Sequence, residues 1–335
     1  MSTRARSSAV TSRCQTSTST RMDHRTDPLN ARTHPVALLA AAILAALTSL
    51  GNAVYAQELT PRAYWPAPVG TRVAVFGYAY TSGDSLLDPS IPLYGVDSKL
   101  HHGVLGYLQT FDLAGRTANI VLELPYSWAE TSGVVVTTPV SRSYSGFSDA
   151  SATLSFNLIG APAMDREAFQ ALRAKPRPML GASLKVVAPT GSYDKDRLLN
   201  PGSNRWAIKP EIGGMIPLTP KLHLEAELGV WLFEDNDDFP TGKREQDPIV
   251  GVELHLIRRF RPGFWASLDA NYFTGGRQTV GGNRLRDVQR NSRLGFTAVV
   301  PFAARHAIKF GFATGVVTEY GTDFDQYLLA YQVLF

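Results

Sequence analysis

Histidine and glutamate stand two residues apart in two segments of the second half of the chain. His223 and Glu225 form the first pair, and Glu253 and His255 form the second. Imidazole and carboxylate groups arranged in this way could bind a metal ion or act as an acid–base pair. Nothing in the spacing fixes three ligands, and histidines that are simply hydrogen-bonded inside a protein are the commoner case. The sequence therefore predicts no metal site and no cofactor.

Nucleophile motifs are missing around the other histidines that we considered. His101, His102 and His306 have no such motif beside them, as a lipid-cleaving serine hydrolase would need. We therefore predict that the protein is not an enzyme.

The segments that carry these residues alternate between apolar and polar side chains. In residues 222–230 and 250–256, leucine, valine and alanine alternate with histidine, glutamate and glycine, and the same period recurs in 151–158 and 308–313. Side chains of a β-strand point alternately to two faces, so each segment predicts a strand with one apolar face. Soluble sheets and membrane barrels share this period, so it does not separate them.

We predict an all-β protein, a transmembrane antiparallel up-and-down barrel of about 12 strands. Each strand has about the length that a tilted membrane strand needs. The strands cover residues 72–80, 102–112, 118–128, 148–158, 179–188, 205–216, 221–233, 249–258, 263–273, 291–300, 305–316 and 326–335.

The links between the predicted strands alternate between short and long. The short links are 113–117, 217–220, 259–262 and 301–304, and the long polar links are 81–101, 129–147, 189–204, 234–248 and 274–290. Outer-membrane barrels have short periplasmic turns and long surface loops, whereas a soluble sandwich has no reason for this asymmetry. The exception is the long link 160–178, in which Asp165 should cap a small periplasmic helix over 165–174.

The C-terminal strand has an apolar or aromatic residue at every second position. We interpret this outward face as the signal that the barrel-assembly machinery reads. Its residues are Tyr327, Leu329, Tyr331, Val333 and Phe335.

An export signal precedes the barrel. Residues 37–50 are almost entirely alanine, leucine and isoleucine, with arginines upstream, so we predict a signal peptide over 1–56, starting at Met1 or Met22. Its removal leaves 27 basic and 27 acidic residues, so the basic precursor indicates no nucleic-acid partner. Cys14, the only cysteine, would also be removed. We predict a periplasmic lead-in over 57–71 and the barrel over 72–335.

Several motifs along the mature chain are similar to one family. They are Pro61-Arg-Ala-Tyr-Trp-Pro-Ala-Pro-Val-Gly-Thr71, Ser145-Gly-Phe-Ser-Asp149, Ala188-Pro-Thr-Gly-Ser-Tyr193, Asn204-Arg-Trp206, Lys209-Pro-Glu211 and Asp235-Asn-Asp-Asp-Phe239. Together they resemble the outer-membrane transporter family named for the meta-pathway of phenol degradation. The resemblance implies a barrel that admits small, often aromatic, organic compounds. It carries over no binding residues.

The inward face of this barrel should carry charges of both signs. Twelve strands enclose a lumen that side chains can fill, so these charges must be paired or hydrated. They could form an ion-pair lattice that braces the barrel or a selectivity lining for a narrow pore. The predicted residues are Glu123, Asp149, Lys185, Lys209, Glu211, Glu225, Glu227, Glu253, His255, Asp269, Arg293 and Lys309.

Two functions fit these patterns. The first is an outer-membrane channel for passive uptake of small organic compounds, with membrane lipid and the solute as its partners. The second is a closed structural or partner-binding barrel whose lumen is plugged by charge pairs. The sequence leaves the solute, the openness of the lumen and the oligomeric state open.

Overall fold

The structure is a computed structural model that describes residues 59–86, 93–135, 137–197 and 199–335. The predicted signal peptide over 1–56, with Met1, Cys14 and Met22, lies outside the described residues. No helix in the described part of the chain is long and apolar enough to cross a membrane.

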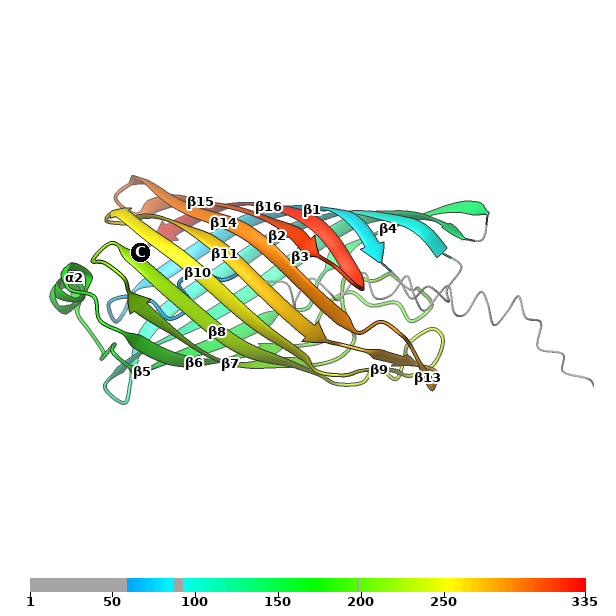
Figure 1. The fold of residues 1–335 in the computed structure, drawn as a ribbon, viewed down its shortest axis with the longest axis horizontal. Helices are drawn as coiled ribbons and strands as arrows, with labels where there is room; N and C mark the ends of the chain where they lie inside the picture. The colour runs from blue at the N-terminus through cyan, green and yellow to red at the C-terminus, as the bar shows by residue number, and fades with distance from the viewer. Residues whose placement is uncertain (1–58, 87–92, 136, 198) are drawn as a thin grey trace, which may run out of the picture. The chain divides into compact units, whose positions relative to one another are not determined.

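The described strands form one large antiparallel sheet that closes on itself (Figure 1). Neighbours along the chain pair with each other, and β1 also pairs with β16, which closes the barrel. The wall consists of β1 (Arg72–Leu86), β2 (Leu93–Leu113), β3 (Arg116–Val135), β4 (Thr138–Phe147), β5 (Ser151–Ile159), β6 (Met179–Val187), β7 (Ala207–Pro217), β8 (Leu222–Phe233), β10 (Ile249–Arg261), β11 (Phe264–Gly275), β14 (Gln289–Ala303), β15 (His306–Val317) and β16 (Gly321–Leu334).

The barrel has twelve strand positions, as the sequence predicted. β4 and β5 share one position, because β4 pairs with residues 126–135 of β3 and β5 pairs with residues 118–123 of the same strand. Each of the twelve predicted segments overlaps one strand of this wall, although residues 148–150 of the fourth segment precede β5 and several strands extend further than predicted. An even number of antiparallel strands is typical of bacterial outer-membrane barrels.

The short turns and the small helix lie at one end of the barrel. The turn after β2 uses Ala114 and Gly115 with φ of 52° and 75°, which is the backbone of a tight hairpin turn. Helix α2 (Arg166–Ala174) is present in the exceptional long link, and the Asp165 side chain accepts a hydrogen bond from the Ala168 amide at 2.8 Å. In Figure 1, α2 and the C-terminus lie at this end.

The long links contain more strand than the sequence predicted. The segment 129–147 was expected to be a loop, but β3 and β4 continue through it as a hairpin. Valines such as Val134 and Val140 favour extended backbone, and pairing satisfies their peptide groups beyond the membrane zone. At the same end, β9 (Arg244–Gln246), β12 (Gln278–Val280) and β13 (Asn283–Arg284) form a second small sheet.

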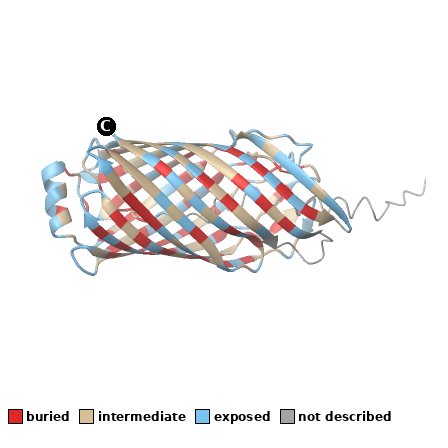
Figure 2. Cartoon of the chain, turned by 90° about the horizontal axis from the view of Figure 1, so that it is seen from above, coloured by how far each residue is buried: buried red, intermediate tan, exposed pale blue. Residues whose placement is uncertain are grey.

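Polarity is inverted relative to a soluble protein. Leu268 on the outer face is 63% exposed, whereas His255 on the inner face is 0% exposed. Figure 2 shows this alternation of buried and exposed residues along the strands. The exposed leucines and phenylalanines suit hydrocarbon, and the closed ladder leaves no strand edge in lipid.

Aromatic residues are exposed near the strand ends, where interfacial girdles are expected. Tyr126, Trp128, Trp206 and Tyr272 are exposed toward the long links. On β16, Tyr327, Leu329 and Tyr331 are exposed, as is Phe335 just beyond the strand, while Val333 is half-buried.

Candidate functional site

The segment that precedes β1 lies inside the barrel. The Thr60 amide donates to Glu253 Oε2 at 3.2 Å, and the amides of Arg62 and Tyr64 donate to the two oxygens of Glu225 at 2.7 and 3.2 Å. The sequence predicted a periplasmic lead-in over 57–71. Residues 60–64 reach into the lumen, because inward carboxylates supply acceptors for their peptide groups. Val69 and Gly70 lie at the short-turn end, where their amides donate to the carbonyl oxygens of Met164 and Thr110.

The Tyr64 ring packs into a space on the inner wall that two glycines leave open, and we call this space its seat. Gly181 on β6 and Gly213 on β7 are cross-strand partners, and a Cβ atom at either position would lie 2.2 or 2.3 Å from the Tyr64 ring. The ring is 1% exposed, and its hydroxyl donates to Glu211 Oε1 at 3.0 Å. Burial, with the nearby Glu211 charge, raises the pKa of the Tyr64 hydroxyl, so the phenol stays protonated and remains a donor.

Trp65 and Arg62 fill the lumen toward the short turns. The Trp65 ring meets His223 edge to face at 5.0 Å, and the Arg259 guanidinium lies 4.8 Å from the Trp65 centroid. Arg62 lies 5.0 Å from the centroid of Trp265 on the opposite side of the segment. We call residues 60–65 the lumen segment. Its contacts obstruct this end of the lumen.

Several predicted inward charges form ion pairs across the wall. Lys209 contacts Glu211 at 2.6 Å and Glu253 at 3.3 Å. Lys185 contacts Glu123 at 3.2 Å. Lys209 and Glu211 lie on β7, and the other two pairs join strands that have one strand between them, β7 with β10 and β6 with β3. Bringing opposite charges together in this way lowers the cost of placing them in a narrow lumen.

His255 has a separate set of partners from His223. The Nδ1 atom of His255 lies 2.8 Å from Asp269 Oδ1, and the other oxygen of Asp269 accepts from the Thr297 hydroxyl at 2.8 Å. His223 instead contacts Met215 Sδ at 3.1 Å and the Trp65 ring. The two histidines therefore do not form a shared pair. His255 lies instead beside Glu253 and Glu227.

The remaining predicted residues have other roles. Arg293 donates to the Phe324 carbonyl oxygen at 2.8 Å, and Lys309 is half-buried on β15. Asp149 lies between β4 and β5, where it accepts from the Gly191 amide at 2.9 Å and from the amide of Ser203 at 2.8 Å. It therefore fastens the loop 188–206 and makes no ion pair among the described residues.

We expect Asp149→Ala to loosen this loop. Hydrogen bonds to a charged group contribute about 1.5–3 kcal/mol, and the two amides would be left without their acceptor. Trypsin should then cut after Lys195 or Arg197 faster in the folded variant than in the unmodified protein. Equal cleavage rates would contradict the role of Asp149.

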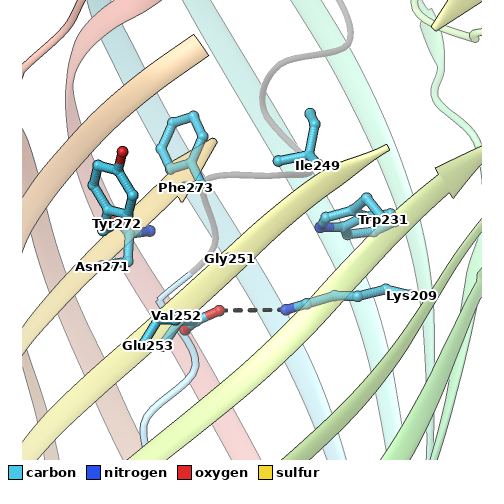
Figure 3. Close-up of a pocket in the computed structure, with 9 residues that line it drawn as sticks. All are labelled: Lys209, Trp231, Ile249, Gly251, Val252, Glu253, Asn271, Tyr272 and Phe273. Carbon is cyan, nitrogen blue, oxygen red and sulfur yellow. Dashed lines mark hydrogen bonds and ion pairs between the residues drawn. The ribbon is translucent and has the colours of Figure 1, made fainter. Parts of the chain in front are cut away.

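A small pocket opens on the inner wall between the ion pairs of Lys209 and the long links (Figure 3). Trp231, Ile249 and Phe273 give it an apolar side, and they belong to a buried cluster that continues to Val187 and Ala207. Lys209, Glu253 and Asn271 form its polar side. The pocket has about 10 Å³ of free volume, which is room for about one water molecule, and its ammonium group is already paired with Glu211 and Glu253.

Sequence reasoning missed the lumen segment. The signal that could have revealed it is a pair of glycines, Gly181 and Gly213, at inward positions of neighbouring strands where large side chains were expected. A large side chain from elsewhere in the chain is expected to fill such a space, and the aromatic residues Tyr64 and Trp65 precede the first strand. The apolar pocket wall was missed because its residues sit at strand ends beyond the alternating core.

The fold and this lumen define an outer-membrane-type barrel with a charged interior that its own N-terminal segment enters. Residues 95–326 match the family described as "Putative MetA-pathway of phenol degradation", and the chain belongs to this family.

Solved structures share the fold. An outer membrane channel from Pseudomonas putida F1 superposes with a TM-score of 0.70 at 23% sequence identity, covering 83% of this chain and 100% of that chain. Two others are less similar. The translocator domain of the autotransporter NalP from Neisseria meningitidis has a TM-score of 0.45 at 12% identity, covering 80% of this chain and 90% of that one. The NanC porin has a TM-score of 0.43 at 7% identity, covering 78% and 98%. No curated protein sequence matches the chain.

Proposed function

We propose that the protein is an outer-membrane channel for the passive uptake of small organic compounds. The observation that carries the proposal is the combination of a lipid-facing apolar exterior with a charged interior. Among the described residues, that interior is obstructed by hydrogen-bonded side chains and the lumen segment. The structural neighbour from Pseudomonas putida is named as a channel, which agrees with this proposal.

The lumen segment acts as a removable obstruction in this proposal. It is held by amide and phenol hydrogen bonds to Glu225, Glu253 and Glu211, and each such bond contributes only a few kcal/mol at most. Its withdrawal would expose a continuous polar wall. Transport would then require no energy source and no catalytic residue.

Small aromatic compounds are the proposed solute class. The rings of Trp231 and Phe273 line the inner wall beside the Lys209 ammonium group, and an aromatic solute with a carboxylate or hydroxyl group could contact both in a lumen widened by withdrawal of the lumen segment. The family description, which refers to phenol degradation, points to the same class.

The alternative is a closed barrel that serves as a structural or partner-binding protein. The buried Tyr64 and the ion pairs of Lys209 favour this reading, because they fill the lumen and satisfy one another. The long links would then carry the binding surface. If the barrel is closed, deleting residues 281–286 should abolish partner binding without changing permeability. If the protein is a channel, the same deletion should alter the flux of solute, or no partner binding should be found in the unmodified protein.

Proteoliposomes distinguish the two functions. The folded mature protein should admit benzoate-sized aromatic acids faster than liposomes without protein. Folded, inserted protein that remains impermeable to all such solutes would exclude the channel and leave the closed barrel.

Export and assembly complete the proposal. We propose that residues 1–56 are removed as a signal peptide and that 72–335 insert as the barrel, guided by recognition of the outward C-terminal face by the barrel-assembly machinery. Tyr327, Leu329 and Tyr331 are exposed on that face. Replacing Phe335 with serine should lower the amount of folded protein in the outer membrane without preventing refolding in detergent.

A further inference from the structure

We propose that Glu227, Glu253 and His255 form a binding site for a first-row divalent transition-metal ion inside the barrel. One ligand atom from each residue lies within 4.8 Å of the others, and all three side chains are buried. The site does not depend on the proposed transport function.

The strand register places these groups together. Glu227 on β8 and Glu253 on β10 are direct cross-strand partners. Like charges in that position destabilise a sheet unless something lies between them. His255 follows on the same face of β10, and its Nε2 atom lies 3.6 Å from Glu253 Oε2. A cation between the two strands would turn this repulsion into a bridge.

Glu227 supplies the second observation. Its side chain is 2% exposed, and neither carboxylate oxygen receives a hydrogen bond from a described residue. A buried carboxylate without a partner costs several kcal/mol, which a metal ion would offset. The Nε2 atom of His255 likewise has no hydrogen bond from the residues that the structure describes.

Asp269 holds His255 in the state that a metal ion requires. Its carboxylate lies 2.8 Å from His255 Nδ1, so that nitrogen carries the proton and donates it. In the neutral imidazole, which is the form that binds a metal ion, the lone pair is then on Nε2, 3.6 Å from Glu253. A carboxylate that orients a histidine in this way is the usual support of a histidine ligand.

The surrounding charges also favour a cation. Carboxylates outnumber the cationic groups in this part of the lumen, and Lys209 already contacts two of them. The carboxylates are Glu211, Glu225, Glu227, Glu253 and Asp269, and the cationic groups are Lys209 and Arg62. Two carboxylates and one imidazole are a ligand set for Zn²⁺, Co²⁺ or Mn²⁺ rather than for Ca²⁺ or Mg²⁺, which prefer oxygen ligands alone.

The bound ion would sit beside the anchor of the lumen segment. Glu253 accepts from the Thr60 amide, and Glu225, next on the inner face of β8, accepts from Arg62 and Tyr64. A metal ion that fixes Glu253 would therefore stabilise the seat of this segment as well as the contact between β8 and β10.

The test is metal binding to the untagged mature protein, refolded in detergent and freed of metal with a chelator. Calorimetric titration with Zn²⁺ should give a single tight site per barrel, and Co²⁺ should give the visible absorption of a low-symmetry nitrogen and oxygen site. Glu227→Gln and His255→Ala should each weaken Zn²⁺ binding by more than about tenfold, and Asp269→Asn, which disturbs the orientation of His255, by about 10–100-fold.

Glu123→Gln is the matched control, because it removes a lumen carboxylate on β3 that pairs with Lys185 and is not a ligand. It should keep one site per barrel. Glu227→Gln also removes a buried carboxyl group that no described residue hydrogen-bonds, so the stabilisation by Zn²⁺ should disappear in this variant. Absence of Zn²⁺ and Co²⁺ binding by the folded protein would overturn the proposal, as would binding that survives both Glu227→Gln and His255→Ala.

Discussion

Deletion of residues 60–66 is expected to turn a weakly conducting barrel into an open pore. The deletion removes the amides that bind Glu253 and Glu225 together with the Tyr64 and Trp65 rings. The barrel wall begins at Arg72 and closes through β1 and β16, so its ladder is untouched. Single-channel conductance in a planar bilayer should rise by at least about tenfold, because the opened lumen is lined by charges that attract hydrated ions.

Thr60→Ala is the control for this deletion. It keeps the backbone amide that donates to Glu253, so its conductance should equal that of the unmodified protein. If the deleted protein folds, inserts and still conducts like the unmodified protein, then the side chains of the wall seal the lumen by themselves.

The second large effect is expected from a single methyl group. In Gly181→Ala the new Cβ would lie 2.2 Å from Tyr64 Cδ1, a distance that atoms in contact do not reach. The ring must leave its seat, which should lower the free energy of unfolding by about 1–3 kcal/mol and release the lumen segment. Released, the segment should be cut by trypsin after Arg62, and the conductance should rise as in the deletion.

A double variant identifies Tyr64 as the cause. In Tyr64→Ala the ring is gone and the new Cβ still meets the Phe156 carbonyl oxygen at 3.0 Å. Adding Gly181→Ala should therefore lower stability much less than in the unmodified protein, and the coupling between the two should be about 1–3 kcal/mol. Gly251→Ala is the matched control, because a Cβ there meets no described atom closer than 3.8 Å. Additive effects of the two substitutions would show that the methyl group acts on the strand rather than on Tyr64.

The wall of the barrel could be predicted from the sequence because its rule is local. Residues such as Leu254 and His255 alternate, and that period places each side chain toward lipid or toward the lumen without further information. The turn residues Ala114 and Gly115 and the helix cap Asp165 are likewise short-range signals.

The contents of the lumen depend on contacts between distant residues, which periodicity does not encode. Tyr64 reaches its seat between Gly181 and Gly213 only after the barrel has closed. The sequence paired His223 with Glu225 and His255 with Glu253, whereas the register sets Glu227 opposite Glu253 and brings His255 to both. Residues 129–147, which were predicted to be a loop, form a hairpin in which the end of β3 pairs with β4. Hydrophobic alternation does not reveal such pairing in a polar segment.

Solute uptake into proteoliposomes tests the central claim most directly, since it asks whether a barrel with this obstructed lumen passes organic molecules. With the unmodified mature protein, we expect entry of a small aromatic acid above the rate of protein-free liposomes, and faster entry when residues 60–66 are absent. Folded and inserted protein that admits no aromatic acid, with or without those residues, would contradict the account.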